Sequence, residues 1–178
     1  MRLIQAGFVL IAGGAVAVRS AIGLQDPGYW NPVTPLDYAA VWWHSAALLG
    51  SAGVAWLVAW LARPDRRSAV AAALGGASLV VAAVANGFED GLGLKVLGSV
   101  YVLGNIVGGF AMIGLVATLA ALGARPLALV ALAAFLGPFL TVAGFIVPVI
   151  YVWFVVVLLR RPASLAPRRP PIEAEPLG

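Results

Sequence analysis

Residues Leu94 to Leu122 read LKVLGSVYVLGNIVGGFAMIGLVATLAAL, and their single charged side chain, Lys95, stands near the beginning. A helix rises about 1.5 Å per residue, so this stretch is long enough to cross a hydrocarbon core of roughly 30 Å. A helix of a soluble protein would carry charged side chains along one face. This stretch therefore predicts a membrane-spanning helix.

Three earlier apolar runs have a comparable length. The chain as a whole is 62% hydrophobic and 10% charged, whereas a soluble domain has about a quarter of its residues charged. The charged residues also gather between the apolar runs. We therefore predict an all-α, polytopic transmembrane helix bundle over residues 1–161, whose first three spans are approximately Leu3 to Leu24, Leu36 to Ala62 and Ser68 to Asn86.

The last apolar run, about Leu127 to Leu159, would reach roughly 50 Å as one helix, which is too long for a single crossing. Gly137-Pro138 and the segment from Gly144 to Pro148 are two candidate breaks. A break near Gly144 to Pro148 gives six spans, and an unbroken run gives five.

Charge favours six spans. Arginines gather at the amino terminus, in the second and fourth loops and after the last run, whereas the other loops carry Lys95 among acids. The positive-inside rule then places both termini in the cytoplasm only if the number of spans is even. If the first run were a signal peptide cleaved after about Ala17, five spans would satisfy the same rule, but its apolar stretch continues to Leu24, which favours a retained helix. The proline- and arginine-rich residues 162–178 are predicted to form a disordered cytoplasmic tail.

Polar side chains inside the apolar runs are the candidate site residues, because such groups are costly in lipid. Arg19, His44 and Asn86 all fall toward the outer side, where Glu89 and Asp90 also lie. They predict either an outward-facing ligand pocket or a set of structural hydrogen bonds and ion pairs. Trp42 and Trp43 are candidates for the same pocket, or for anchors at the membrane interface, the usual role of tryptophans at this depth.

Asn105 lies near the middle of the fourth run, between Gly104 and Gly108. An amide at this depth is a further candidate ligand contact, and its alternative role is a hydrogen bond between helices. The GxxxG spacing of the two glycines predicts close helix packing, either within the bundle or across a homodimer or partner interface.

Several classes of chemistry are disfavoured. The chain has no cysteine and one histidine, so disulfides, thiolate metal sites, Fe–S clusters and a haem held by two histidines are excluded. All seven acidic residues fall in loops or in the tail, so no carboxylate is placed for an intramembrane proton relay. We expect no catalytic residues, no metal, no cofactor and no nucleic-acid partner.

Two stretches carry a resemblance to known proteins. Residues 34–45, TPLDYAAVWWHS, and 97–109, LGSVYVLGNIVGG, together resemble small multi-pass bacterial membrane proteins of domain-of-unknown-function type. Trp30-Asn31-Pro32 and residues 148–153, PVIYVW, are faintly similar to the translocator-protein family, which implies five spans and binding of porphyrins or sterols. The charged loop at Glu89-Asp90 departs from that family.

The function expected from these features is that of a non-enzymatic accessory, assembly or structural subunit in the plasma membrane of a bacterium, in contact with lipid and with a protein partner. The alternative is a binder or carrier of a small apolar or amphipathic molecule through the outward-facing pocket.

Overall fold

A computed structural model gives the structure of the protein and describes residues 2–25, 32–141, 143–160 and 165. Six α-helices are present in these ranges, and the same residues contain no strand. Residues 26–31, Arg161 and all of the expected tail except Leu165 lie outside the described residues. Leu165 itself is 1% exposed and packs in the hydrophobic core, which the prediction of a disordered tail did not include.

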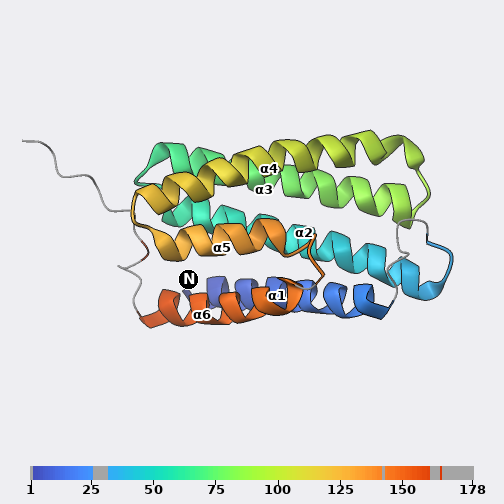
Figure 1. Ribbon diagram of the computed structural model, residues 1–178, viewed down its shortest axis with the longest axis horizontal. Helices are drawn as coiled ribbons and strands as arrows, with labels where there is room; N and C mark the ends of the chain where they lie inside the picture. Colours follow the sequence, from blue (N-terminus) through green and yellow to red (C-terminus); the bar gives the residue numbers. More distant parts are fainter. Residues whose placement is uncertain (1, 26–31, 142, 161–164, 166–178) are drawn as a thin grey trace, which may run out of the picture.

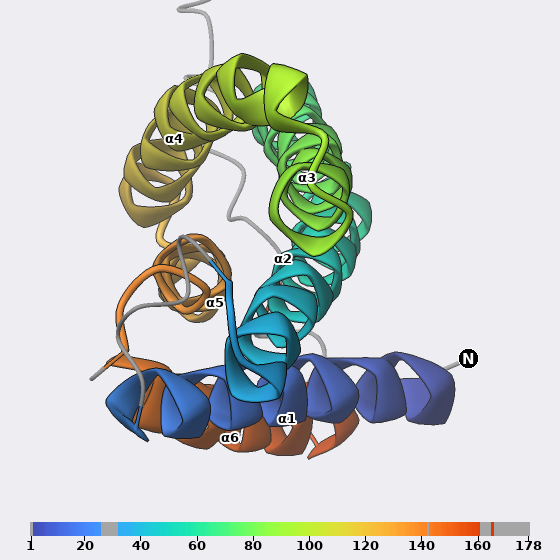
Figure 2. The same cartoon turned by 90° about the vertical axis from the view of Figure 1, so that its right-hand side faces the viewer.

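The first four helices confirm the four long apolar runs. They are α1 (Arg2–Gln25), α2 (Pro35–Leu61), α3 (Arg66–Asn86) and α4 (Gly98–Ala121). By length and composition, four helical segments of the described chain are long and apolar enough to cross a membrane. They run in alternating directions, and α2, α3 and α4 lie side by side in an arc (Figures 1 and 2).

The ends of these helices follow from local sequence. Thr34 caps α2: its hydroxyl accepts the N–H of Asp37 at 3.3 Å, and the Asp37 carboxylate accepts the N–H of Thr34 at 2.7 Å. Asp65 caps α3 by accepting the N–H of Ser68 at 2.9 Å. Gly123 ends the turn after α4 at φ +71°, a conformation that glycine adopts without a steric penalty.

A short loop region joins α3 to α4. Helix α3 continues into a π-helical turn, η1 (Gly87–Gly91), and a 3₁₀ turn, η2 (Lys95–Leu97), precedes α4. Lys95 and Asp90 form an ion pair of 3.0 Å within this loop. Glu89 and Asp90 thus lie at the end of the bundle opposite the α2–α3 and α4–α5 connections, which carry arginines (Figure 1).

The last apolar run forms two short helices, α5 (Arg125–Leu136) and α6 (Ile146–Arg160), with a 3₁₀ turn, η3 (Ala143–Phe145), before the second. The helix stops at Leu136, so the chain turns at residues 137–145, earlier than the expected turn at Gly144 to Pro148. Pro148 lies inside the first turn of α6, where a missing N–H costs no helical hydrogen bond. A single helix over residues 127–159 does not form.

Helices α5 and α6 make a hairpin that enters the bundle only part of the way. At about 1.5 Å per residue they extend roughly 18 Å and 22 Å, and both start or finish at the same end as the beginning of α1 (Figure 1). Seen along the bundle, α5 lies inside the arc of α2 to α4, while α6 lies beside α1 (Figure 2). The tip of this hairpin therefore reaches the middle of the bundle.

Helix α1 runs beside α6, is inclined to α2 and crosses it at close range (Figure 2). A Cβ atom built on Gly50 would lie 2.9 Å from both Cα and Cβ of Ala12. Because the two helices diverge from this crossing, apolar grooves open on both sides of it. The core itself is made of small and aliphatic side chains, with Tyr151 and Phe154 of α6 fully buried.

Candidate functional site: a polar layer at the tip of the hairpin

Arg19 is the first member of a polar layer at the tip of the α5–α6 hairpin. Its side chain is 3% exposed, and one guanidinium nitrogen, Nη1, donates to the hydroxyl of Thr141 at 3.0 Å. Thr141 follows the helical break and lies against Gly23 of α1. Gly144 of the same turn packs directly on Ser20, where a Cβ would overlap the serine side chain. Helix α1 therefore holds the hairpin tip by one charged hydrogen bond and by close contact at two glycines.

His44 of α2 is the second member. The ring is 1% exposed, and its Nε2 lies 3.1 Å from the hydroxyl of Tyr101 on α4. The backbone carbonyl of Pro138 lies beside the ring, and the Arg19 guanidinium is close enough to act on it electrostatically. The ring of Phe139 meets it edge to face with centroids 6.0 Å apart. His44 thus contacts α4 on one side and the hairpin tip on the other.

The hydrogen bond between His44 and Tyr101 can run in either direction. Which of the two groups donates depends on the tautomer of the ring. In both cases the bond joins α2 to α4, and the ring contact with Phe139 joins α2 to the hairpin tip.

Asn86 lies next to this layer, at the end of α3. Its amide nitrogen donates to the backbone carbonyl of Val41 at 3.2 Å and to the hydroxyl of Ser45 at 2.9 Å. The side chain is 1% exposed. Both donor hydrogens of the amide are used, so Asn86 joins α3 to α2 at the level of His44.

Asn105 is placed differently from the other candidates. It lies one helical turn after Tyr101 on α4 and is partly buried. Its Oδ1 atom is buried and has no hydrogen-bond partner within the described residues. Unlike the amide of Asn86, this oxygen therefore makes no hydrogen bond to another helix of the described chain.

Gly104 and Gly108 face α3 of the same chain. A Cβ at Gly104 would lie 3.3 Å from the carbonyl oxygen of Ser78, and one at Gly108 would lie 3.0 Å from the Cβ of Ser78. The two glycines therefore allow the backbones of α3 and α4 to approach closely.

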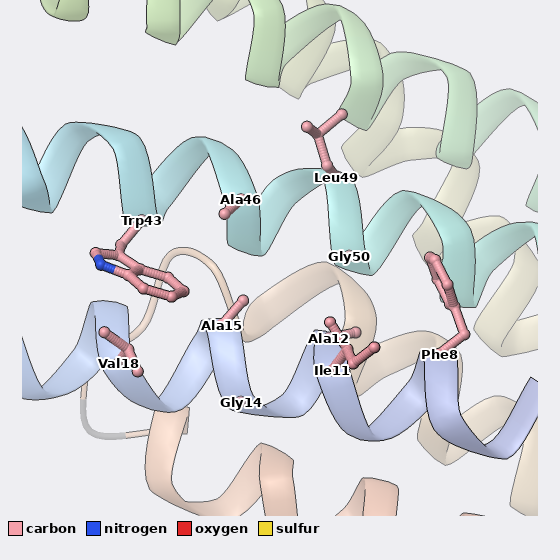
Figure 3. A pocket seen from close by; sticks show the side chains of 10 residues that line it. All are labelled: Phe8, Ile11, Ala12, Gly14, Ala15, Val18, Trp43, Ala46, Leu49 and Gly50. Carbon is pink, nitrogen blue, oxygen red and sulfur yellow. The ribbon is translucent and has the colours of Figure 1, made fainter.

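The two tryptophans before His44 point away from the polar layer. Trp42 covers the π-helical turn, because Cβ atoms at Gly87 and Gly91 would lie 3.1 Å and 2.8 Å from its ring. Trp43 lines an apolar groove of about 480 Å³ between α1 and α2 (Figure 3). The lining of this groove includes neither His44 nor Trp42, and both tryptophans are at least 40% exposed.

The structure thus brings Arg19 and His44 together, places Asn86 beside them and engages Asp90 with Lys95. Sequence reasoning missed the partners Thr141, Pro138, Phe139 and Tyr101. The position of Tyr101 one turn before Asn105, on the same helix face, was the one available signal. Within the ranges the structure describes, no group of three or more His, Cys, Asp or Glu residues is arranged to hold a metal ion.

Comparison with protein-family models, with curated proteins and with solved structures found no match to this chain. The two resemblances noted from sequence motifs gain no support from these comparisons. The assignment of roles therefore depends on the geometry of this chain.

Proposed function

We propose that the protein is a non-enzymatic accessory or structural subunit of a bacterial plasma membrane, which contacts a protein partner through the outer face of α4. The observation that carries the proposal is the low burial of α4. Only 22% of the residues in its apolar window are buried, against 39%, 56% and 44% in the windows of the other three span-length segments. Phe110, at the middle of that face, is 75% exposed.

The polar layer supports a structural role over a catalytic one. His44 and Asn86 each make a hydrogen bond that joins two helices, and Arg19 makes one that joins α1 to the hairpin tip. None of the three lines the grooves beside α1. A buried polar group that is satisfied within the protein contributes to a unique packing arrangement. In this proposal the candidate site residues Arg19 and His44 position the hairpin and do not catalyse a reaction.

The distribution of charge supports the orientation. The beginning of α1, the α2–α3 and α4–α5 connections and the end of α6 all lie at one end of the bundle and carry arginines (Figure 1). We place this end in the cytoplasm by the positive-inside rule. The described arginines at this end are Arg2, Arg63, Arg66, Arg67, Arg125 and Arg160.

Both termini are then cytoplasmic, as the six-span prediction requires. In this proposal α1 to α4 cross the bilayer completely, and α5 and α6 take the place of the fifth and sixth spans as a short hairpin that enters from the cytoplasmic side. Its non-helical tip is compatible with membrane depth because Thr141 and Phe139 pack against α1 and α2, while the exposed side chains of the tip, Leu140 and Phe145, are apolar.

The test is site-specific photo-crosslinking in the native membrane. A photoreactive phenylalanine analogue at position 110 is expected to give a discrete crosslinked protein band, identified by mass spectrometry. The matched control is the same analogue at Val149 of α6, which is 67% exposed. A band at both positions, or no protein crosslink at position 110, contradicts the proposal. A band at the mass of two copies of this chain assigns α4 to a homodimer instead of a partner complex.

The apolar groove between α1 and α2 favours a second candidate, the binding or carriage of a small apolar molecule. Its volume of about 480 Å³ lies within the range of small-molecule sites, and Trp43 offers an aromatic wall (Figure 3). Native mass spectrometry of the protein extracted in mild detergent tests this candidate. A discrete added mass that disappears in Ala46→Phe, which fills the groove, would favour it.

A further inference from the structure

A second groove, between α3 and α4, has a different character from the one beside Trp43. It has a volume of about 640 Å³ and is lined on one side by residues 65–74, the cap and first nine residues of α3, and on the other by Ala111 of α4. Arg66 and Arg67 stand at its mouth, together with Asp65. Val70, Ala71 and Leu74 form its floor. Cationic groups and apolar groups are therefore separated along the groove.

We propose that this groove binds one anionic phospholipid of the cytoplasmic leaflet. The phosphate would lie at the guanidinium groups of Arg66 and Arg67, and one acyl chain would lie along Val70, Leu74 and Ala111. The site requires the membrane orientation proposed above but does not depend on a protein partner at α4.

The charge at the mouth is complementary to a phosphodiester. Guanidinium groups bind phosphate oxygens in a bidentate manner and are more weakly hydrated than the ammonium group of lysine. The Asp65 carboxylate is turned onto the backbone N–H of Ser68 at 2.9 Å, as the cap of α3. Two guanidinium charges and one capping carboxylate leave a net charge of +1, which matches one anionic head group.

The depth of the groove matches the shape of a lipid rather than that of a free anion. Leu74 lies eight residues after Arg66, which on a helix is about 12 Å deeper into the bundle. Val70 and Leu74 are 50% and 54% exposed on α3, as expected for side chains in contact with an acyl chain. A free phosphate would use only the mouth and would leave this floor unoccupied.

The test is lipid titration by native mass spectrometry of the full chain in a neutral detergent, with phosphatidylglycerol as the probe and phosphatidylcholine as the neutral comparison. The double variant R66Q/R67Q is expected to bind the first phosphatidylglycerol roughly 30-fold more weakly, with phosphatidylcholine unaffected. The matched control, R125Q/R160Q, removes two arginines from the same end outside the groove, and is expected to change binding by less than about 3-fold. Equal weakening by both pairs would overturn the proposal, because it would show a diffuse attraction to the basic end.

A charge-neutral variant tests the acyl-chain part of the site. Ala111→Phe fills the groove and is expected to weaken phosphatidylglycerol binding while both arginines remain. Glycerol phosphate, which has the head-group phosphate but no acyl chains, is expected not to displace the lipid. This competition experiment uses the wild-type chain, so it tests the acyl-chain part of the site even if Ala111→Phe does not fold. Displacement of phosphatidylglycerol by glycerol phosphate would overturn the lipid assignment in favour of a site for small anions.

Discussion

The crossing of α1 and α2 at Gly50 allows a prediction of stability whose sign is set by two distances. A methyl group at position 50 would lie 2.9 Å from both Cα and Cβ of Ala12. Two carbons pack without repulsion at about 3.5 Å or more, so the new group is short of room by about 0.6 Å. One of the two obstacles is backbone, which a change of rotamer cannot move.

Gly50→Ala should therefore destabilise the protein. Overpacking of a close contact costs about 1–3 kcal/mol, and the better helix propensity of alanine returns up to about 1 kcal/mol. We expect a net loss of about 1–2 kcal/mol in the free energy of unfolding, measured by reversible denaturation in detergent micelles. A separation of α1 from α2 would accompany this loss.

Gly14→Ala is the matched control, because a Cβ at Gly14 on α1 would meet nothing within 4 Å. This variant should be neutral or stabilised by up to about 1 kcal/mol. The double variant Gly50→Ala/Ala12→Gly removes the contact with the Ala12 methyl group but leaves the contact with its Cα, so it should recover only part of the loss. Gly50→Ala as stable as Gly14→Ala would refute a close crossing at this point.

Three further predictions concern the polar layer and the cap of α3, all measured by the same unfolding assay. Tyr101→Phe removes the hydroxyl that lies 3.1 Å from His44 and should cost about 1 kcal/mol, whereas Tyr38→Phe at a 42% exposed position should cost much less. Asn86→Ala removes two hydrogen bonds from a buried amide and should cost about 1–3 kcal/mol. Asn105→Ala, which removes an unpartnered Oδ1, should cost less. A larger loss for Asn105→Ala than for Asn86→Ala would contradict the structural role of Asn86. Asp65→Ala removes the cap of α3 and should cost about 1 kcal/mol at neutral pH. Ser68, whose hydroxyl and backbone N–H face the carboxylate, holds the pKa of Asp65 below its usual value. The contribution of the cap is therefore present above the unfolded-state pKa of about 3.9 and is lost as the pH falls through the lower folded-state pKa. A stability difference between wild type and Asp65→Ala that stays constant down to pH 2 would refute this role of the cap.

The positions of the four long helices could be predicted from sequence. The fourth run, expected at about Leu94 to Leu122, contains α4 at Gly98–Ala121, and the first run differs from α1 by one residue at each end. Length and composition are sufficient for such helices, because each satisfies its own backbone hydrogen bonds and needs no distant partner. The gathering of arginines at alternate connections could also be predicted, because it follows from position along the chain.

The form of the last apolar run could not be predicted from its periodicity. Both Gly137-Pro138 and the segment around Gly144 offered a break, and local propensity does not choose between them. The chain turns at the first of these because Pro138 and Phe139 contact His44, while Thr141 contacts Arg19. Those partners are about 95 or more residues away in sequence, so only the tertiary arrangement selects the turn.

The candidate site divides in the same way. Composition alone marked Arg19, His44 and Asn86 as residues that need partners, since an unsatisfied polar group is costly in an apolar medium. Which groups those partners are depends on helix rotation and register, which a single sequence does not specify. The tertiary structure joins these side chains to α4, α2 and the hairpin tip and turns Gly104 and Gly108 toward α3. It leaves the opposite face of α4 exposed, because α3 and α5 both pack on its inner side.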